Sequence, residues 1–141
     1  MTPIFGHDDA VAELVGRLLG HPIHPPYTAI GFTDHQGNVC GGAVFNAYNG
    51  SNIDLTVYLP RTDRAAIRVI VAYVFVQLEC NRLTARTQTT NVRAKKALEK
   101  IGFKFEAVLK NWFGPGKQNS GVMYRLDKQT ALERWLPNGR A

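Results

Sequence analysis

The sequence has few of the residues that mark disulfide-rich or membrane-spanning proteins. Its 141 residues include two cysteines, Cys40 and Cys80, which could form one disulfide at most. The most apolar run, Ala65 to Leu78, is interrupted by Arg68 and Gln77. A membrane span needs roughly 20 consecutive apolar residues, so this run predicts a buried helix instead.

Signals for export and for metal binding are also lacking. Met1 to Ala10 has no basic start followed by an apolar stretch, so we expect no secretion signal and a cytoplasmic protein. In that compartment the two cysteines are expected to be reduced thiols in or near the core. His21 and His24 lie in the proline-rich segment Gly20–Pro26 without Cys, Asp or Glu at ligand spacing. This pattern predicts an ordered surface loop and no metal site.

Acidic residues are the scarcer charged class, with 11 Asp and Glu against 17 Lys and Arg, and the net charge is +6. A basic surface attracts anions such as a phosphorylated cofactor, an acidic protein or nucleic acid, and charge alone does not choose among them. The basic residues concentrate between Arg61 and Lys110, which indicates the half of the chain that faces the anion.

Hydrophobic periodicity and turn residues predict one domain over residues 1–141 with a mixed α/β fold of about six strands. A strand-helix-strand unit in the middle requires a parallel or nearly parallel pair, flanked by antiparallel hairpins. The expected elements are a helix capped by Asp8 or Asp9 and ending near Leu19, strands 27–33, 39–46 and 53–59, a helix 65–80 capped by Thr62 or Asp63, a strand 82–89, a helix capped by Thr90 or Asn91 and closed by Gly102, strands 104–112 and 121–126, and a final amphipathic turn or helix with Leu132 and Trp135.

The sharpest local signal is the segment Pro60–Ala66, where a strand end passes through a basic loop into a helix start. Free amides at a helix N-terminus, together with Arg61 and Arg64, favour a bound phosphate and would accommodate a pyrophosphate. The alternative is a solvated basic connection, because the segment has no glycine to let a ligand approach the backbone closely.

The second half of the chain contains the motifs Tyr73–Ala85 (YVFVQLECNRLTA), Asn91, Ala97–Phe103 (ALEKIGF), Phe105–Lys110 and Val122–Leu126. Together these motifs resemble the GNAT superfamily of N-acetyltransferases. The resemblance covers about residues 52–135 and is greatest to the branch that acetylates the N-termini of ribosomal proteins, with its small bacterial and phage-borne relatives. Each motif is weak by itself, whereas their order and spacing together are fairly specific.

The resemblance implies an acetyl-coenzyme A site where the fourth strand parts from the fifth. The pantetheine arm would pair with the fourth strand at Leu55, Thr56, Val57 and Tyr58. The pyrophosphate loop of the family falls on Arg61, Arg64, Ala65 and Ala66, although Arg64 stands where a glycine is expected. Asn91 matches an asparagine that contacts the pantetheine arm, and capping of the following helix is its alternative role.

The proton donors of the family are missing. Many members have a tyrosine seven residues after the asparagine, where this chain has Leu98, and the ribosomal branch often has a serine three residues after it, where this chain has Ala94. A thiol with a pKa of roughly 8.5 leaves as thiolate with little help. Asp54 is the candidate general base, with Glu79, a histidine or a water relay as alternatives and a solvent-facing strand residue as its simpler interpretation.

The leading hypothesis is an acetyl-CoA-dependent N-acetyltransferase in which a bound amine attacks the thioester directly. The acceptor would be a protein N-terminus or a small molecule. Members of the GNAT family usually have two helices on the acceptor side, whereas one precedes the sheet here, so the resemblance implies an acceptor pocket that is either open or completed by a second subunit in a homodimer. The first alternative is a degenerate member that binds coenzyme A or a partner without turnover. The second is a nucleic-acid-acting member, suggested by the charge and by Trp112, Phe113 and Tyr124 among basic residues. No membrane is expected as a partner.

Overall fold

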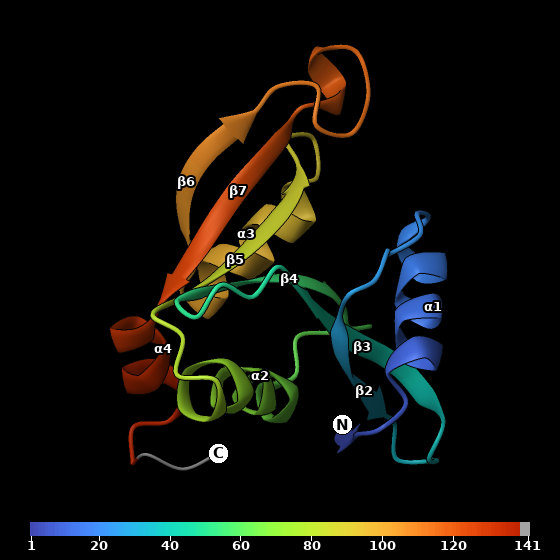
Figure 1. Ribbon diagram of the computed structural model, residues 1–141, viewed down its shortest axis with the longest axis vertical. Helices are drawn as coiled ribbons and strands as arrows, with labels where there is room; N and C mark the ends of the chain where they lie inside the picture. The colour runs from blue at the N-terminus through green and yellow to red at the C-terminus, as the bar shows by residue number, and fades with distance from the viewer. Residues whose placement is uncertain (139–141) are drawn as a thin grey trace.

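A computed structural model describes residues 1–138 of the chain (Figure 1). The strands are β1 (Thr2–Ile4), β2 (Thr28–Thr33), β3 (Val39–Asn46), β4 (Asn52–Tyr58), β5 (Arg82–Gln88), β6 (Lys104–Leu109) and β7 (Gly121–Asp127). The helices are α1 (Asp8–Leu19), α2 (Arg64–Val71), which continues as the π-helical segment η1 (Ala72–Gln77), α3 (Val92–Ile101), the short η2 (Lys117–Asn119) and α4 (Lys128–Trp135).

The strands form one sheet in the order β1-β2-β3-β4-β5-β7-β6. Every neighbouring pair is antiparallel except β4 and β5, which are parallel, so the predicted mixed sheet is confirmed. The residues described contain seven strands where the sequence predicted about six. The additional strand is β1, whose three residues pair with β2 but are too few for a periodic pattern.

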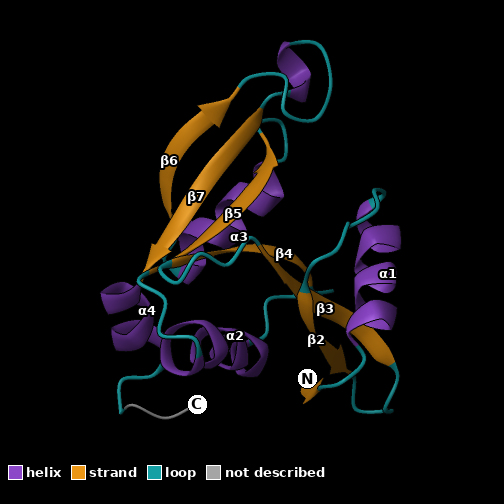
Figure 2. Ribbon diagram, in the orientation of Figure 1, coloured by secondary structure: helices purple, strands orange, loops and turns teal. Residues whose placement is uncertain are grey.

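The sheet lies between two helical layers (Figures 1 and 2). On one face α1 packs on β2, β3 and β4 through a cluster that includes Val11, Val15 and Val44. A Cβ on Gly42 would lie 2.5 Å from Val11, so the glycine lets this helix approach the sheet closely. On the other face α2 and α3 bury the larger core, whose members include Ile67, Phe75 and Leu98.

Two of the three predicted helix caps are confirmed. The Asp63 side chain accepts a hydrogen bond from the amide of Ala66 at the start of α2, and Asn91 does the same for Ala94 at the start of α3. The cap predicted for α1 is wrong, because Asp8 is already helical and His7 precedes it without a side-chain bond. The two aspartates instead occupy the first turn, where the helix dipole favours negative charge.

Two predicted boundaries also differ, and one open alternative is decided. The helix expected over 65–80 changes to π-helical geometry at Ala72 and ends at Gln77. The strand expected over 104–112 ends at Leu109, because the chain turns at Asn111, whose φ is +58°. The C-terminal segment, left open as a turn or helix, is the helix α4, and the indole of Trp135 donates to the carbonyl of Ile101.

Neither cysteine is in a disulfide. Cys80 is fully buried, and burial raises the pKa of its thiol while Lys128 opposes that shift, so the thiol is not a prepared nucleophile. Cys40 is partly exposed, and its sulfur lies 3.5 Å from the carbonyl oxygen of Phe32. Among residues 1–138, no helix is both long enough and apolar enough to cross a membrane.

Candidate functional site

The parallel strands β4 and β5 part halfway along their length. Their pairing runs from Asn52 opposite Arg82 to Leu55 opposite Ala85 and goes no further. Beyond that point Thr56–Tyr58 pair only with β3, and Arg86–Gln88 pair only with β7. The main-chain groups that face the gap therefore have no strand partner, and an extended ligand with amide groups could pair with them. The predicted cofactor residues Thr56, Val57 and Tyr58 form one side of this gap.

An apolar cavity of about 50 Å³ lies on the α2 and α3 side of the parting strands. Its walls come from β4 and Leu59 just after it, α2, β5, α3, Phe103 and β7. The lining residues are Leu55, Val57, Leu59, Ile67, Ile70, Val71, Leu83, Leu98, Ile101, Phe103 and Leu126. A hollow of about 400 Å³ at Gly6–Ala10 is built from one short segment and is widely open to solvent, so it holds no constellation of groups that could bind a cofactor.

Asp63 occupies part of the predicted phosphate seat at the N-terminus of α2. Asp63 is 9% exposed, and its carboxylate accepts from the Ala66 amide at 2.9 Å, the Met1 ammonium at 3.2 Å and the Arg61 guanidinium at 3.3 Å. Burial opposes ionisation, but the amide of Ala66 and then the two cations outweigh it and hold the pKa of Asp63 below its usual range. The Ala66 amide is therefore not free for a phosphate.

The two arginines of that loop are placed differently. Arg61 is largely solvent-exposed, with one nitrogen on Asp63. The guanidinium of Arg64 lies over the Trp135 ring at 5.4 Å from its centroid. Within residues 1–138, the amides of Arg64 and Ala65 have no hydrogen-bond partner. The loop therefore offers two amides and one exposed guanidinium, fewer groups than the sequence predicted.

The start of α3 lies on the same face of the sheet as the cavity. The Oδ1 atom of Asn91 accepts from the Ala94 amide at 3.0 Å, so the capping role predicted as its alternative is present. Its contact with a pantetheine arm stays a prediction. Leu98, at the position where the GNAT resemblance expects a tyrosine, is buried in the cavity wall and supplies no proton donor.

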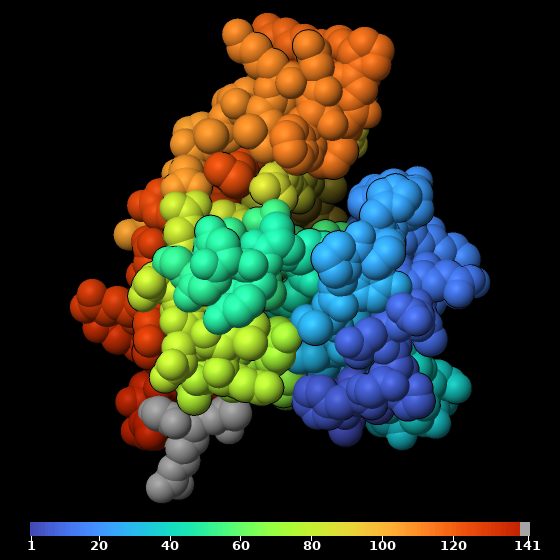
Figure 3. All heavy atoms as spheres, in the orientation of Figure 1, coloured from blue at the N-terminus to red at the C-terminus, as the bar shows by residue number. Residues whose placement is uncertain are grey.

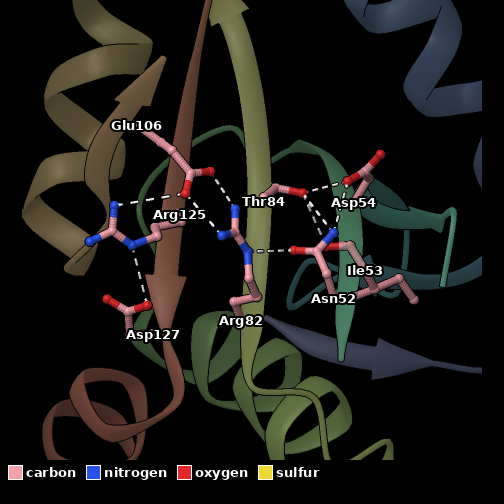
Figure 4. A network of polar contacts seen from close by, with 8 residues as sticks. All are labelled: Asn52, Ile53, Asp54, Arg82, Thr84, Glu106, Arg125 and Asp127. Atoms are coloured by element: carbon pink, nitrogen blue, oxygen red, sulfur yellow. Dashed lines mark hydrogen bonds and ion pairs between the residues drawn. The ribbon is translucent and has the colours of Figure 1, made fainter. Parts of the chain in front are cut away.

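The opposite face of β4 and β5 is polar (Figure 4). Asp54 accepts from the hydroxyl of Thr84, from Asn52 at 3.3 Å and from Arg86 at 3.1 Å. The Arg86 guanidinium also lies over the Trp112 ring at 5.1 Å. Asp54 is thus an ion-paired carboxylate beside the parting strands, and it would have to loosen one of these bonds to accept a proton from an amine.

A second polar group on this face joins β5, β6 and β7. Arg82 donates two hydrogen bonds to Glu106 and a third to Asn52, and Arg125 lies between Glu106 and Asp127 (Figure 4). Hydrogen bonding from Arg82 is the largest cause of the lowered pKa of Glu106, and the charge of Arg125 adds to the effect. In Figure 3 the end of the β6–β7 hairpin, in orange, stands away from α1 and the loop after it, in blue, and leaves an open notch on this face.

Sequence reasoning missed Arg86 and the partnership of Trp112 with it. Their positions depend on the parallel register and on the turn after β6, neither of which the sequence states. One signal was present: Arg82, Thr84 and Arg86 alternate along one strand and so share its polar face. Of the alternative bases, Glu79 lies after η1 with a φ of +55°. A role for Glu79, for a histidine or for a water relay stays a prediction.

No family model and no curated protein sequence matches this chain. Solved structures do match. A probable acetyltransferase superposes with a TM-score of 0.63 at 21% identity over 73% of this chain and 62% of its own length, which is less than two thirds of that protein. A dodecameric spermidine N-acetyltransferase from Vibrio cholerae gives 0.68 at 18% identity over 89% of this chain and 77% of its own. A chimera of that enzyme gives 0.67 at 18% over 75% and 70%.

The chain has the GNAT fold. At these identities the likeness concerns the fold and not the activity, and it does not identify a branch of the superfamily. The parted strands and the cavity beside them are therefore the features from which function has to be argued.

Proposed function

We propose that this GNAT-fold chain is an N-acyltransferase that moves an acetyl group from acetyl-coenzyme A to an amine. The observation that carries the proposal is the parting of β4 and β5 after Leu55 and Ala85. It leaves the main-chain donors and acceptors of Thr56–Tyr58 that face β5 without a strand partner, which is the chemistry that an amide-containing pantetheine arm requires. Acetyltransferases among the solved structures with this fold support the same class of reaction.

The residues fit the arm of the donor better than its diphosphate. Thr56, Val57 and Tyr58 would pair with the arm, and Arg61 with the free amides of Arg64 and Ala65 would hold phosphate oxygens. Arg64 would contribute only after leaving Trp135, and Ala66 only after leaving Asp63. Asn91 has its amide nitrogen left for the arm, because its oxygen caps α3.

In the proposed reaction the amine nitrogen forms a bond to the thioester carbonyl carbon, and the carbon–sulfur bond breaks. The sulfur leaves with the electron pair and takes up a proton, and the nitrogen loses one to Asp54 or to water. Leu98 offers no acid, but a thiol of pKa roughly 8.5 needs little assistance to leave. An amine with a pKa of about 8 is partly neutral near neutral pH, which favours an α-amine over a lysine as acceptor.

Two features bear on partners. The notch on the Asp54 face is open, so a second copy of the chain could close it, and a related fold occurs in a dodecameric enzyme. Location in the cytoplasm, one domain over the whole sequence and a protein or small-molecule acceptor stay predictions.

A second candidate function, binding of coenzyme A or of a partner without turnover, is favoured by Asp63 in the phosphate seat and by Leu98.

The test is a calorimetric titration of the protein with acetyl-CoA, followed by an assay of amine-dependent thiol release. We expect micromolar binding that Arg61→Glu weakens at least tenfold, because reversing one charge beside the phosphates changes the attraction by more than 1 kcal/mol at short range. Arg17→Glu is the matched control, since Arg17 is exposed on α1, across the sheet from the cavity. Binding without thiol release would favour the non-catalytic candidate, and absence of binding would overturn the proposal.

A further inference from the structure

We propose that the preferred acyl donor carries a chain longer than acetyl, of about four or five carbons, whose end fills the apolar cavity beside the parted strands. This inference rests on the proposed function, because it names the donor of the same site. It is carried by the cavity itself, by its purely apolar lining and by the identity of residue 98.

The cavity adjoins the point where β4 and β5 separate. Leu55 and Leu83 belong to the paired stretch, and Val57 lies two residues beyond its end on β4. Val57 and Leu59, which follow the last paired residue of β4, are only partly buried, whereas the deeper walls, such as Leu83 and Leu126, are almost fully buried. The cavity therefore has a deep end in the core and a shallow end toward the gap between the strands.

An unfilled space of this kind is unfavourable in a protein core. Interiors are close-packed, and each void forfeits contacts of the atoms that line it. Water would not compensate, because a buried water needs two to four polar partners and all eleven lining residues are apolar. The group that suits the space is an aliphatic chain.

The volume sets the length of that chain. About 50 Å³ is several times the roughly 10–15 Å³ that one water requires, which leaves room for about three or four carbon atoms. An acetyl group has one carbon beyond its carbonyl and would leave most of this space empty. A butyryl group, with three carbons beyond its carbonyl, would occupy it, whereas a hexanoyl group, with five, would exceed it.

Leu98 is the wall residue that makes the space available. It projects from α3 into the cavity, at the position where the GNAT resemblance expects a tyrosine. A tyrosine ring would take up this volume and would bring a hydroxyl into it, whereas leucine keeps it apolar. The reaction is unchanged by the longer chain: the amine nitrogen bonds to the thioester carbon, the sulfur leaves, and the proton passes from nitrogen to sulfur through base and solvent.

The experiment is calorimetric titration of the whole chain with coenzyme A, acetyl-CoA, butyryl-CoA and hexanoyl-CoA. Burial of each methylene contributes roughly 0.8 kcal/mol, so butyryl-CoA should bind about tenfold more tightly than acetyl-CoA. Thiol release with a fixed amine should favour butyryl-CoA in the same order. Equal or weaker binding of butyryl-CoA would overturn the inference.

Variants assign the effect to the cavity. Leu98→Phe should abolish the butyryl preference and leave the affinity for coenzyme A within about twofold, because it fills the space without touching the arm. Ile101→Phe, from the partly exposed side of the wall, serves the same purpose if the first variant does not fold. Val76→Phe is the control, since Val76 is exposed on η1 and does not line the cavity. Thermal unfolding verifies that each variant is folded.

The outcomes separate this inference from the proposed function. No binding of any coenzyme A thioester would remove both. Binding of acetyl-CoA with no gain for butyryl-CoA would leave the acetyltransferase and remove the longer donor. A butyryl preference that survives in both Leu98→Phe and Ile101→Phe would place the acyl chain elsewhere and overturn the assignment of the cavity.

Discussion

Asp63 shows how one buried carboxylate can serve stability at a position predicted to serve binding. It caps α2 and joins that helix to the start of β1 through the Met1 ammonium. The Asp63 carboxylate accepts a hydrogen bond from the Ala66 amide, which has no partner within the helix. Asp63→Ala should therefore lower the free energy of unfolding by about 1–2 kcal/mol at neutral pH. Chemical denaturation measures this, and Asp63→Asn, which keeps the cap but not the charge, should lose less. Equal stability of all three proteins would contradict the role.

The same carboxylate predicts a pH dependence. Its pKa in the folded protein lies below that of an unfolded aspartate, about 3.9, so the stabilisation it contributes is present above that pH. It is lost as the pH falls through the lower folded pKa. The difference in unfolding free energy between the unmutated protein and Asp63→Asn should therefore shrink as the pH falls below about 4. A difference that stays constant to lower pH would show that the charge of Asp63 contributes nothing.

Among the elements, the edge strand β6 depends on the polar group that ties it to β5. Glu106 sits at an irregularity in the β6–β7 register and receives two hydrogen bonds from Arg82. Both side chains are partly exposed, so Glu106→Gln should cost only about 1 kcal/mol. Amide hydrogen exchange should accelerate in β6 and not in β2, because the tie is local. Exchange that is unchanged in β6 would assign the strand's stability to its backbone pairing with β7.

The elements that the sequence predicted well are those with a local cause. Caps at Asp63 and Asn91 and the glycine at 102 are visible in the sequence because each needs only residues within one helical turn. β1 was missed because its three residues are held by β2 and not by any pattern of their own. The candidate site divides in the same way. Thr56–Tyr58 were named through the GNAT resemblance, whereas Arg86, Trp112 and the cavity require a parallel register and helix packing between segments far apart in the chain.

At the scale of the whole molecule, the net charge of +6 is unevenly placed. The two helices beside the cavity carry exposed cations on their outer sides. Within the part of the chain that the structure describes, only Arg61 among these cations forms an ion pair, with Asp63. The cations are Arg61 just before α2, Arg64 and Arg68 on α2, and Arg93, Lys96 and Lys100 on α3. This face of the molecule should attract a polyanionic donor and raise its local concentration.

Varying the salt concentration therefore tests whether these cations contribute to binding of the acyl donor. Exposed charges are screened over about 10 Å at 0.1 M salt and about 3 Å at 1 M. Raising the salt from about 0.05 M to about 0.5 M should weaken acetyl-CoA binding roughly tenfold in calorimetry. S-acetyl pantetheine, which has the same arm and no phosphate, should bind with little salt dependence. If a single-stranded RNA competes with acetyl-CoA at low salt, the cations serve nucleic acid as well; if salt leaves acetyl-CoA binding unchanged, the parted strands and not the charge supply the affinity.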